Sequence, residues 1–168
     1  IASRFNHHFG EHFVLPEAVV NEKTAVLSGL DGRKMSKSYN NTIPLFAPEK
    51  QLRQLIMKIK TNSLGPSEPK ETSGCTLFEI YQAFATPEEV AAMRKSYAEG
   101  IAWGEMKKTL FEQLNEYLSE PRQKYETLMK APDHIENVLQ EGARKAREYS
   151  RPFLKQLRKA IGIDKITG

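Results

Sequence analysis

Cysteine is almost absent from this 168-residue sequence, which contains one, Cys75. A single thiol excludes an internal disulfide bond and a zinc site built from several cysteine thiolates. It suits a reducing compartment, so we expect a cytoplasmic protein in which Cys75 is a packed or partly exposed thiol.

Long hydrophobic runs are also missing. No apolar run approaches the roughly 20 residues that a membrane-spanning helix needs. The opening stretch, IASRFNHHFG, lacks the features of a secretory signal and starts with Ile1 rather than methionine. We therefore expect no membrane role, and we expect the chain to begin inside a longer protein.

Charge of one sign does not dominate, since the formal net charge is only +4. It is unevenly distributed, however, and the region from Gly142 to Lys165 contains eight basic residues against two acidic ones. Four of the basic residues are spaced three or four apart, which puts them on one helix face: Arg144, Arg147, Arg151 and Lys155. An apolar series containing Tyr149, Phe153 and Leu157 falls on the opposite face. The pattern predicts one packed face and one basic face, which either binds RNA or is simply solvated.

Helix signals dominate the sequence after residue 47. We expect helices to begin near Pro48, to run from a Thr86 cap to Gly100, and to span about 105–119 and 132–161. Pro121 should start or kink a further helix, Pro152 should bend the last one, and residues 62–76 should form a surface connection. Before residue 47, a short helix should end near Gly10, and residues 24–29 predict a buried strand. The fold class is therefore mostly α: residues 1–46 are the tail of an α/β unit, and residues 47–168 form an antiparallel helical bundle.

One short stretch, GRKMSKSYNN at residues 32–41, carries most of the functional information. Gly32 permits a sharp turn, while Lys34 and Lys37 are flexible point charges suited to a polyphosphate. Two serines, Ser36 and Ser38, can bond phosphate oxygens or the loop's own backbone, and the apolar Met35 can pin the loop to the protein body. Asn40 and Asn41 can hold turns or cap the next segment of the chain.

Two other interpretations of this stretch compete with a polyphosphate site, and the sequence excludes one of them. A solvated turn is the ordinary explanation for two lysines and two serines in a loop. A phosphate-binding P-loop is excluded by spacing, because that motif requires G-x-x-x-x-G-K-[ST].

A metal site on His8 and His12, near the start of the chain, is also disfavoured, because Gly10 lies between them and interrupts any continuous helical face.

The order of residues separates these interpretations. Lys34-Met35-Ser36-Lys37-Ser38 matches, letter for letter, the KMSKS signature of class I aminoacyl-tRNA synthetases. The stretches RFNHHFGEHFVLPEAVV, LSGLDGRKMSKSYNNTIPLF, LIMKIKTNS and LQEGARKARE resemble successive landmarks of bacterial tryptophanyl-tRNA synthetases, over essentially the whole chain. Tyrosyl-tRNA synthetases are the nearest alternative, and a non-catalytic tRNA-binding module is another.

The resemblance implies a role for several residues. In such enzymes the loop closes over Mg²⁺-ATP while the amino acid is activated, so Lys34 and Lys37 would be catalytic and would stabilise the departing pyrophosphate. The ATP-binding set would be Ala25, Lys34, Met35, Ser36, Lys37 and Ser38, with Val26 an alternative to Ala25. Residues 1–46 would end a Rossmann-like catalytic domain, and residues 47–168 would recognise the anticodon of tRNA(Trp). The complete enzyme would be a homodimer that binds ATP, tryptophan and tRNA. The HIGH-type motif and amino-acid pocket have no counterpart in this sequence, so the chain alone is expected to be inactive.

Overall fold

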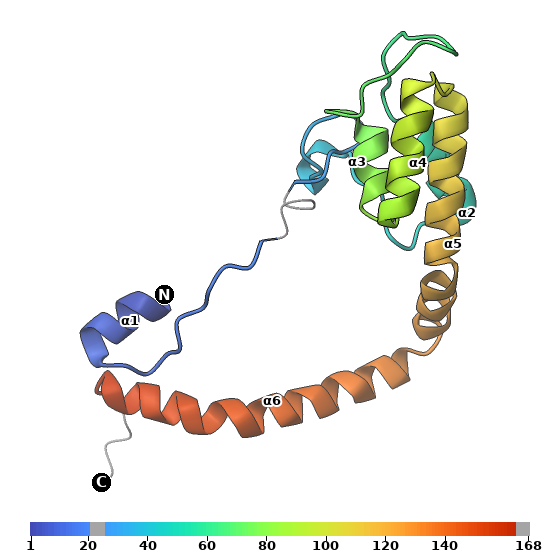
Figure 1. Cartoon of the computed structure of the whole chain (residues 1–168). Coiled ribbons are helices and arrows are strands. Elements are labelled where there is room, and N and C mark those ends of the chain that lie inside the picture. Colours follow the sequence, from blue (N-terminus) through green and yellow to red (C-terminus); the bar gives the residue numbers. More distant parts are fainter. Residues whose placement is uncertain (21–25, 164–168) are drawn as a thin grey trace. The chain divides into compact units, whose positions relative to one another are not determined.

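The computed structural model describes residues 1–20 and 26–163, and these belong to two compact units. One unit combines Ile1–Val19 with the segment from Leu128 onward, and the other spans Val20–Thr127. The described residues form six α-helices and one short 3-10 helix but no β-strand, as the ribbon in Figure 1 illustrates. The prediction of a mostly helical fold is therefore confirmed.

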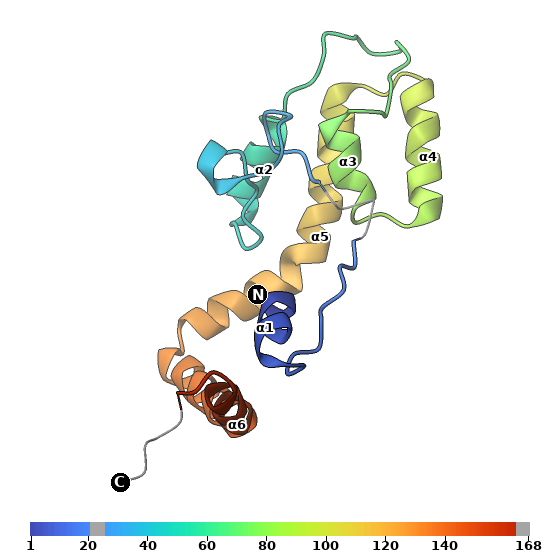
Figure 2. The ribbon, with the colours of Figure 1, turned by 90° about the vertical axis from the view of Figure 1, so that its left-hand side faces the viewer.

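The unit spanning Val20–Thr127 contains the hydrophobic core. Its helices are α2 (Glu49–Met57), α3 (Thr76–Gln82), α4 (Pro87–Ala98) and most of α5 (Trp103–Met129). In Figure 2, α3 and α5 lie between α2 and α4. The least exposed side chains come from all four helices and from the turn after α2: Leu52, Ile56, Ile59, Leu77, Phe78, Tyr97, Met106 and Leu110. This core supports the loop at residues 28–41, since Leu27, Leu30 and Ile43 pack against it.

Helix α4 begins and ends as the sequence predicts. The Thr86 hydroxyl accepts a hydrogen bond from the Glu89 N–H (3.3 Å), and the Glu89 carboxylate accepts one from the Thr86 N–H (2.7 Å). This reciprocal capping box and Pro87 at the first helical position define the N-terminus. At the other end Gly100 has φ of +89°, where a Cβ would collide with the backbone of Ser67.

The prediction for the next helices was wrong in one respect. Helix α5 does not end near Ser119 but continues through Pro121 to Met129. Proline removes one N–H from the helical ladder, yet the helix survives because its preceding turns are fixed by buried residues such as Leu114 and Leu118.

Most of the aromatic residues predicted to be structural do pack. Phe78, Tyr81 and Phe111 are buried and Phe84 is half-buried, whereas Tyr117 is 62% exposed but still meets Phe84 edge-on, with ring centroids 5.3 Å apart. The Trp103 ring stands edge-on to Tyr97, with ring centroids 5.9 Å apart, and its Nε1 donates a hydrogen bond to the side chain of Asn62 (3.2 Å). Cys75 is half-buried, and its Sγ lies 3.4 Å from the Tyr97 hydroxyl.

The other unit is built from two helices, α1 (Ala2–Phe9) and α6 (Pro132–Ala160). Helix α1 ends before Gly10, which has φ of +91°, as expected. The Asn6 side chain closes the following turn by donating to the Phe13 carbonyl (2.7 Å) and accepting from the Phe13 N–H (2.9 Å). Phe13 then contacts Phe153 of α6 edge-on, with ring centroids 5.2 Å apart.

The predicted packed face of α6 is only partly present. Phe153 and Leu157 are half-buried, but Tyr149 is 88% exposed, and within the described residues α6 has no fully buried side chain. The helix runs through Pro152, where the sequence led us to expect a bend. The contact that Phe13 makes with Phe153 covers little of a helix of this length, and among the described residues the apolar face of α6 is mostly exposed.

Two further expectations concern residues 1–46. The strand expected at residues 24–29 lies partly outside the described residues, and the part from Val26 to Gly29 forms only a single antiparallel bridge, between Ser28 and Lys34. A strand requires a partner along its length, and these residues find one at a single position. The expected boundary at 46/47 does not separate compact units, because the loop and α2–α5 share one; as a division between a catalytic and an anticodon-binding domain it stays a prediction.

Candidate functional site

The candidate site begins as a tight hairpin. The Met35 N–H donates to the Leu27 carbonyl (2.8 Å), and the Gly29 N–H donates to the Arg33 carbonyl (2.7 Å). Gly32, with φ of +84°, closes the turn by donating to the Gly29 carbonyl (2.9 Å). The prediction that Gly32 permits a sharp turn is confirmed, and the hairpin delivers the chain into the KMSKS segment, residues 34–38.

The second half of the KMSKS segment is a single turn of 3-10 helix, Lys37–Tyr39. Ser36 caps it, because its hydroxyl accepts a hydrogen bond from the Ser38 N–H (3.3 Å). Asn40 ends it in the left-handed conformation, with φ of 51°, and its N–H donates to the Lys37 carbonyl (3.1 Å). Ser36 therefore bonds the loop's own backbone, which is one of the two roles that its sequence position allows.

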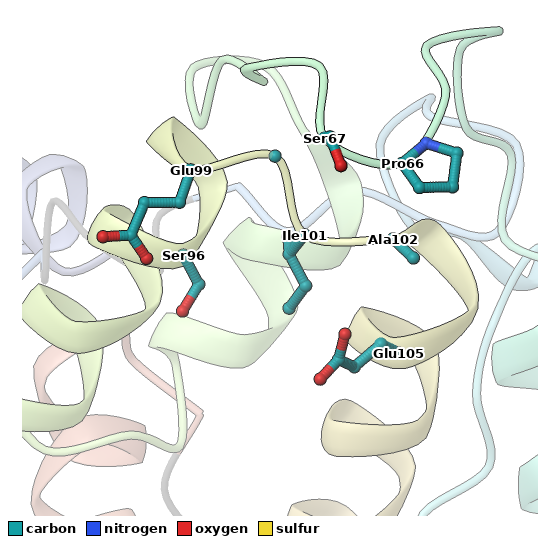
Figure 3. Close-up of a pocket in the computed structure, with 8 residues that line it drawn as sticks. Pro66, Ser67, Ser96, Glu99, Ile101, Ala102 and Glu105 are labelled. Atoms are coloured by element: carbon teal, nitrogen blue, oxygen red, sulfur yellow. The ribbon is translucent and has the colours of Figure 1, made fainter.

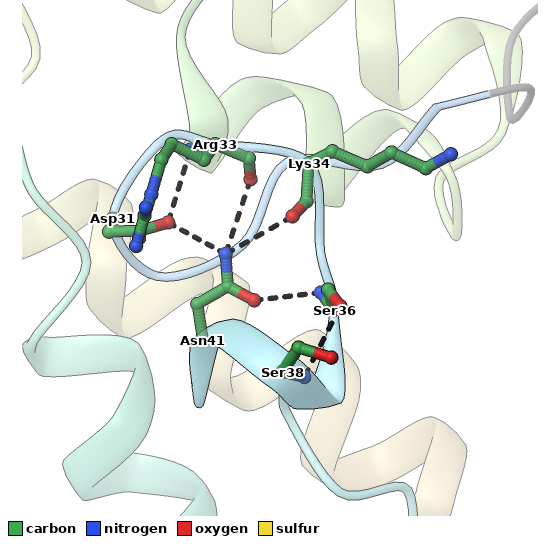
Figure 4. A network of polar contacts seen from close by, with 6 residues as sticks. All are labelled: Asp31, Arg33, Lys34, Ser36, Ser38 and Asn41. Carbon is green, nitrogen blue, oxygen red and sulfur yellow. Dashed lines mark hydrogen bonds and ion pairs between the residues drawn. The ribbon is translucent and has the colours of Figure 1, made fainter.

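Asn41 connects the hairpin to this turn (Figure 4). Its side chain is 2% exposed, and its Oδ1 accepts a hydrogen bond from the Ser36 N–H (2.8 Å). Its Nδ2 lies within hydrogen-bond distance of the Asp31 carboxylate (2.7 Å) and of the carbonyls of Lys34 (3.2 Å) and Arg33 (3.4 Å). One buried side chain thus touches four residues of the loop.

Asp31 and Arg33 form a second layer around Asn41. The Asp31 carboxylate accepts from Asn41, from the Arg33 backbone N–H (3.1 Å) and from the Arg33 guanidinium, whose Nη2 lies 2.6 Å away. These bonds, that from Asn41 first, lower the pKa of Asp31 to about 2 despite a smaller opposing desolvation. The guanidinium also lies over the Tyr39 ring, 4.4 Å from its centroid. The Asp31 and Arg33 charges are consequently satisfied within the loop.

The lysines of the KMSKS segment differ from Asp31 and Arg33 in how their charges are paired. Lys34 and Lys37 are both exposed, and within the part of the chain that the structure describes neither ammonium group forms an ion pair. Met35 and Ser36 are half-buried and Ser38 is exposed, so the segment is anchored at its centre with its charges outward. This arrangement can receive an anion carrying several negative charges.

The predicted backbone contact to adenine, at Ala25 or its alternative Val26, precedes the hairpin in the sequence. Ala25 is outside the described residues, so its position is not tested. Its alternative, Val26, is 61% exposed.

The predicted RNA-binding residues of α6 divide into two groups. Arg144 forms ion pairs with Glu141 (2.7 Å) and Glu148, so its charge is engaged along the helix. Arg147, Arg151 and Lys155 are exposed and form no ion pair among residues 1–20 and 26–163. The last three are therefore available to an external anion.

Two cavities of the helical unit are lined by neither Lys34 nor Lys37. One, of about 350 Å³, lies between α4, α5 and the 65–68 loop, where Glu99, Ser96 and Glu105 line it (Figure 3). The other, of about 380 Å³, is bounded by Gly32, Lys60, Cys75 and Trp103. Gly32 of the hairpin borders the second cavity, but neither cavity is lined by a residue of the KMSKS segment.

Membrane spans and metal clusters are not features of the described residues. None of their helices is both long and apolar enough to cross a membrane. Within the same ranges, histidine, cysteine and acidic side chains do not gather in groups of three or more that could hold a metal ion.

Comparisons with known proteins identify the same family as the KMSKS signature does. The family model described as tRNA synthetases class I (W and Y) matches residues 1–119. The tryptophan–tRNA ligase of Pseudomonas aeruginosa is 53% identical over 166 residues, and that of Neisseria meningitidis serogroup A is 51% identical over 163. Each alignment covers 97% of this chain but only 37% and 48% of the respective relative.

A solved structure gives the same result. The tryptophanyl-tRNA synthetase of Campylobacter jejuni, crystallised with ADP and tryptophan, is 39% identical and superposes with a TM-score of 0.79 over 96% of this chain and 51% of its own. The expected resemblance to tryptophanyl-tRNA synthetases is therefore confirmed. With a family model matching residues 1–119 and the KMSKS signature inside that range, this chain belongs to the class I tRNA synthetases of the tryptophan and tyrosine group.

Proposed function

We propose that this chain is the part of a tryptophan–tRNA ligase that contains the KMSKS loop and the anticodon-binding helices. The observation that carries the proposal is a KMSKS signature with two exposed lysines, unpaired within the described residues, in a chain 53% identical to a tryptophan–tRNA ligase. Because the chain spans 37% of that relative's length, the activity belongs to the complete enzyme, and this part alone is expected to be inactive.

The reaction gives the two lysines a defined task. The carboxylate of tryptophan attacks the α-phosphorus of ATP, the bond from that phosphorus to the bridging oxygen breaks, and pyrophosphate leaves. The aminoacyl group of the resulting adenylate then passes to the 3′ end of tRNA. Negative charge grows on the leaving pyrophosphate, and the ammonium groups of Lys34 and Lys37 stabilise it as the loop closes. Ser38 and the backbone of the segment bind phosphate oxygens.

The remaining parts of the proposal concern partners. Mg²⁺ would enter with ATP, and Asp31, the one carboxylate in the sequence of residues 28–41, is already engaged by Asn41 and Arg33. The enzyme is a cytoplasmic homodimer, residues 1–46 complete its Rossmann-like catalytic domain, and Ala25 contacts adenine. These points rest on family resemblance.

A pyrophosphate-exchange assay on the complete enzyme tests the function. Exchange of labelled pyrophosphate into ATP should depend on tryptophan and not on tyrosine, because activation requires the matching amino acid in its pocket. Exchange stimulated by tyrosine alone would support a tyrosyl enzyme instead. A gene without an upstream nucleotide-binding half would favour a non-catalytic RNA-binding module.

The basic face of α6 provides a second prediction. Reversing the charge of Arg147 and Arg151 together should weaken tRNA binding at low salt about tenfold or more, because both guanidinium groups are exposed and free of carboxylates in the described structure. Losing two phosphate contacts should also reduce the slope of log affinity against log salt by roughly 1 to 2. Nitrocellulose filter binding over a salt series measures both quantities.

A matched control separates contact from net charge. Lys50 and Lys58 are exposed residues at α2, and reversing both gives the same change in total charge. Their reversal should alter affinity far less. If the α6 double variant bound tRNA like the wild type at low salt, the basic face would be only a solvated surface.

A further inference from the structure

Asn41 lies outside the five-residue signature, yet it makes more contacts with the loop than any serine within it. We propose that Asn41 is a positioning residue: its buried carboxamide joins the hairpin to the 3-10 turn and thereby fixes where Lys34 and Lys37 present their ammonium groups. The inference rests on the proposed function and adds a residue to which neither the signature nor the comparisons assign a role.

The contacts of Asn41 straddle both lysines. Its Nδ2 reaches the backbone carbonyls of Arg33 and Lys34, at the end of the hairpin, while its Oδ1 accepts from the N–H of Ser36, immediately before Lys37. Its own backbone carbonyl accepts from the Leu30 N–H (2.9 Å), which ties the same residue to the first arm of the hairpin. The backbone at each lysine is therefore held from one central group.

Packing leaves the carboxamide little freedom to move. Asn41 is 2% exposed, and a Cβ at Gly29 would overlap both its side-chain carbonyl carbon and its Nδ2. Gly29 is thus required here for close approach rather than for an unusual φ angle. Because a buried amide that lost its partners would pay the full cost of desolvation, the bonded arrangement is strongly favoured.

The pattern of donors and acceptors fits asparagine in particular. One end of the side chain faces an N–H, from Ser36, and the other faces three oxygen atoms. Aspartate would satisfy the N–H but would place an oxygen against the other three, and alanine would satisfy neither end. Aspartate at this position would also set a carboxylate beside that of Asp31, where like charges repel.

A fixed loop shape matters for the chemistry. Lys34 and Lys37 have no ion pair within the described residues, so their flexible side chains depend on the backbone for their starting position. A displacement of about 1 Å at a reacting group can lower a rate about 100-fold, which sets the scale of the expected effect.

The test uses the complete synthetase and a double-mutant cycle. Asn41→Ala should lower kcat for pyrophosphate exchange about 10- to 100-fold while tryptophan affinity changes little. In a background in which both lysines are already replaced, Lys34→Ala/Lys37→Ala, Asn41→Ala should cost less than about threefold, because its effect is exerted through these two lysines. Full additivity of the two losses would overturn the proposal.

A second pair of variants keeps the test decisive if alanine disturbs folding. Asn41→Asp should reduce exchange as strongly as alanine, and adding Asp31→Asn should recover part of the loss, since an amide and a carboxylate again face each other between the two positions. No recovery would count against the proposal. Asn40→Gly is the matched control, because Asn40 is exposed and glycine retains its left-handed conformation. It should behave like the wild type.

A measurement without substrates distinguishes this inference from the proposed function. In the absence of nucleotide, amide hydrogen exchange over residues 33–40 should be about tenfold faster in Asn41→Ala than in the wild type and unchanged in Asn40→Gly. Equal exchange in all three proteins would contradict the positioning role. A wild-type enzyme without tryptophan-dependent pyrophosphate exchange would instead contradict the proposed function and leave the hydrogen-exchange result interpretable.

Discussion

Replacing Lys37 by alanine in the complete synthetase is expected to lower the rate of tryptophan activation roughly 100- to 1000-fold. The ammonium group is exposed and forms no ion pair in the described structure, so no internal carboxylate competes for it. Stabilisation of charge that develops only in the transition state is worth about 3 to 4 kcal/mol per group, which corresponds to this loss. Single-turnover formation of tryptophanyl-adenylate measures the effect directly.

Tryptophan affinity should remain nearly unchanged in the same variant, because the amino-acid pocket is not expected within this chain. Lys50→Ala is the matched control, since Lys50 is an exposed lysine on α2 outside the loop, and it should have no measurable effect on activation. A loss below threefold for Lys37→Ala would reject a catalytic role for this lysine. Equal losses for Lys37→Ala and Lys50→Ala would indicate a general effect of charge.

The helices could be predicted where local chemistry alone determines them. Thr86, Pro87 and Glu89 form a capping box from residues close in sequence, and the structure contains both of its hydrogen bonds. The left-handed glycines at the ends of α1 and α4 are local signals of the same kind. Helix α5 was harder, because a proline normally interrupts a helix, and whether it does so depends on packing that the sequence does not display.

In the candidate site, too, the features set by local sequence could be predicted and those that depend on packing could not. The signature identified the loop and its two lysines, and Gly32 was identified as a turn residue. The role of Asn41 was missed because it depends on burial and on contacts with Asp31, Arg33 and Ser36 at the same time. A loop asparagine ordinarily caps a turn, and nothing local indicates that this one is 2% exposed. An aspartate ten residues earlier in the same loop was the only available signal.

The strand expectation failed for a different reason. Apolar and β-branched residues describe a side-chain preference, whereas a strand exists only where a second backbone supplies hydrogen bonds. In the described part of the segment, that partner is present at the Ser28–Lys34 bridge alone. The hydrophobic residues are still used, since Leu27 and Leu30 pack against the helical core and so connect the position of the loop to the stability of the helices beneath it.

Because the loop packs on the helical core, a substitution in that core is the second change for which we expect a large effect. Phe78 of α3 is 1% exposed, its ring meets Tyr97 edge-on at 5.4 Å, and the Arg94 guanidinium lies 4.6 Å from its centroid. Phe78→Ala should lower the free energy of unfolding of the helical unit by about 3 to 5 kcal/mol, because it removes a buried ring and leaves a cavity. Urea denaturation of the 168-residue chain measures this through Trp103, its one tryptophan, which contacts Tyr97 in the same cluster.

Tyr117→Ala is the matched control for this experiment, because Tyr117 is an aromatic residue of the same unit that is 62% exposed. It should cost about 1 kcal/mol, because the exposed ring loses an edge-on contact with Phe84 but leaves no buried cavity. The urea midpoint of Phe78→Ala should fall with little change in the slope, since the surface exposed on unfolding is nearly the same. A loss for Phe78→Ala no larger than that for Tyr117→Ala would mean that this cluster does not hold the helices together. The loop that packs on it through Leu27 and Leu30 would then need another source of rigidity.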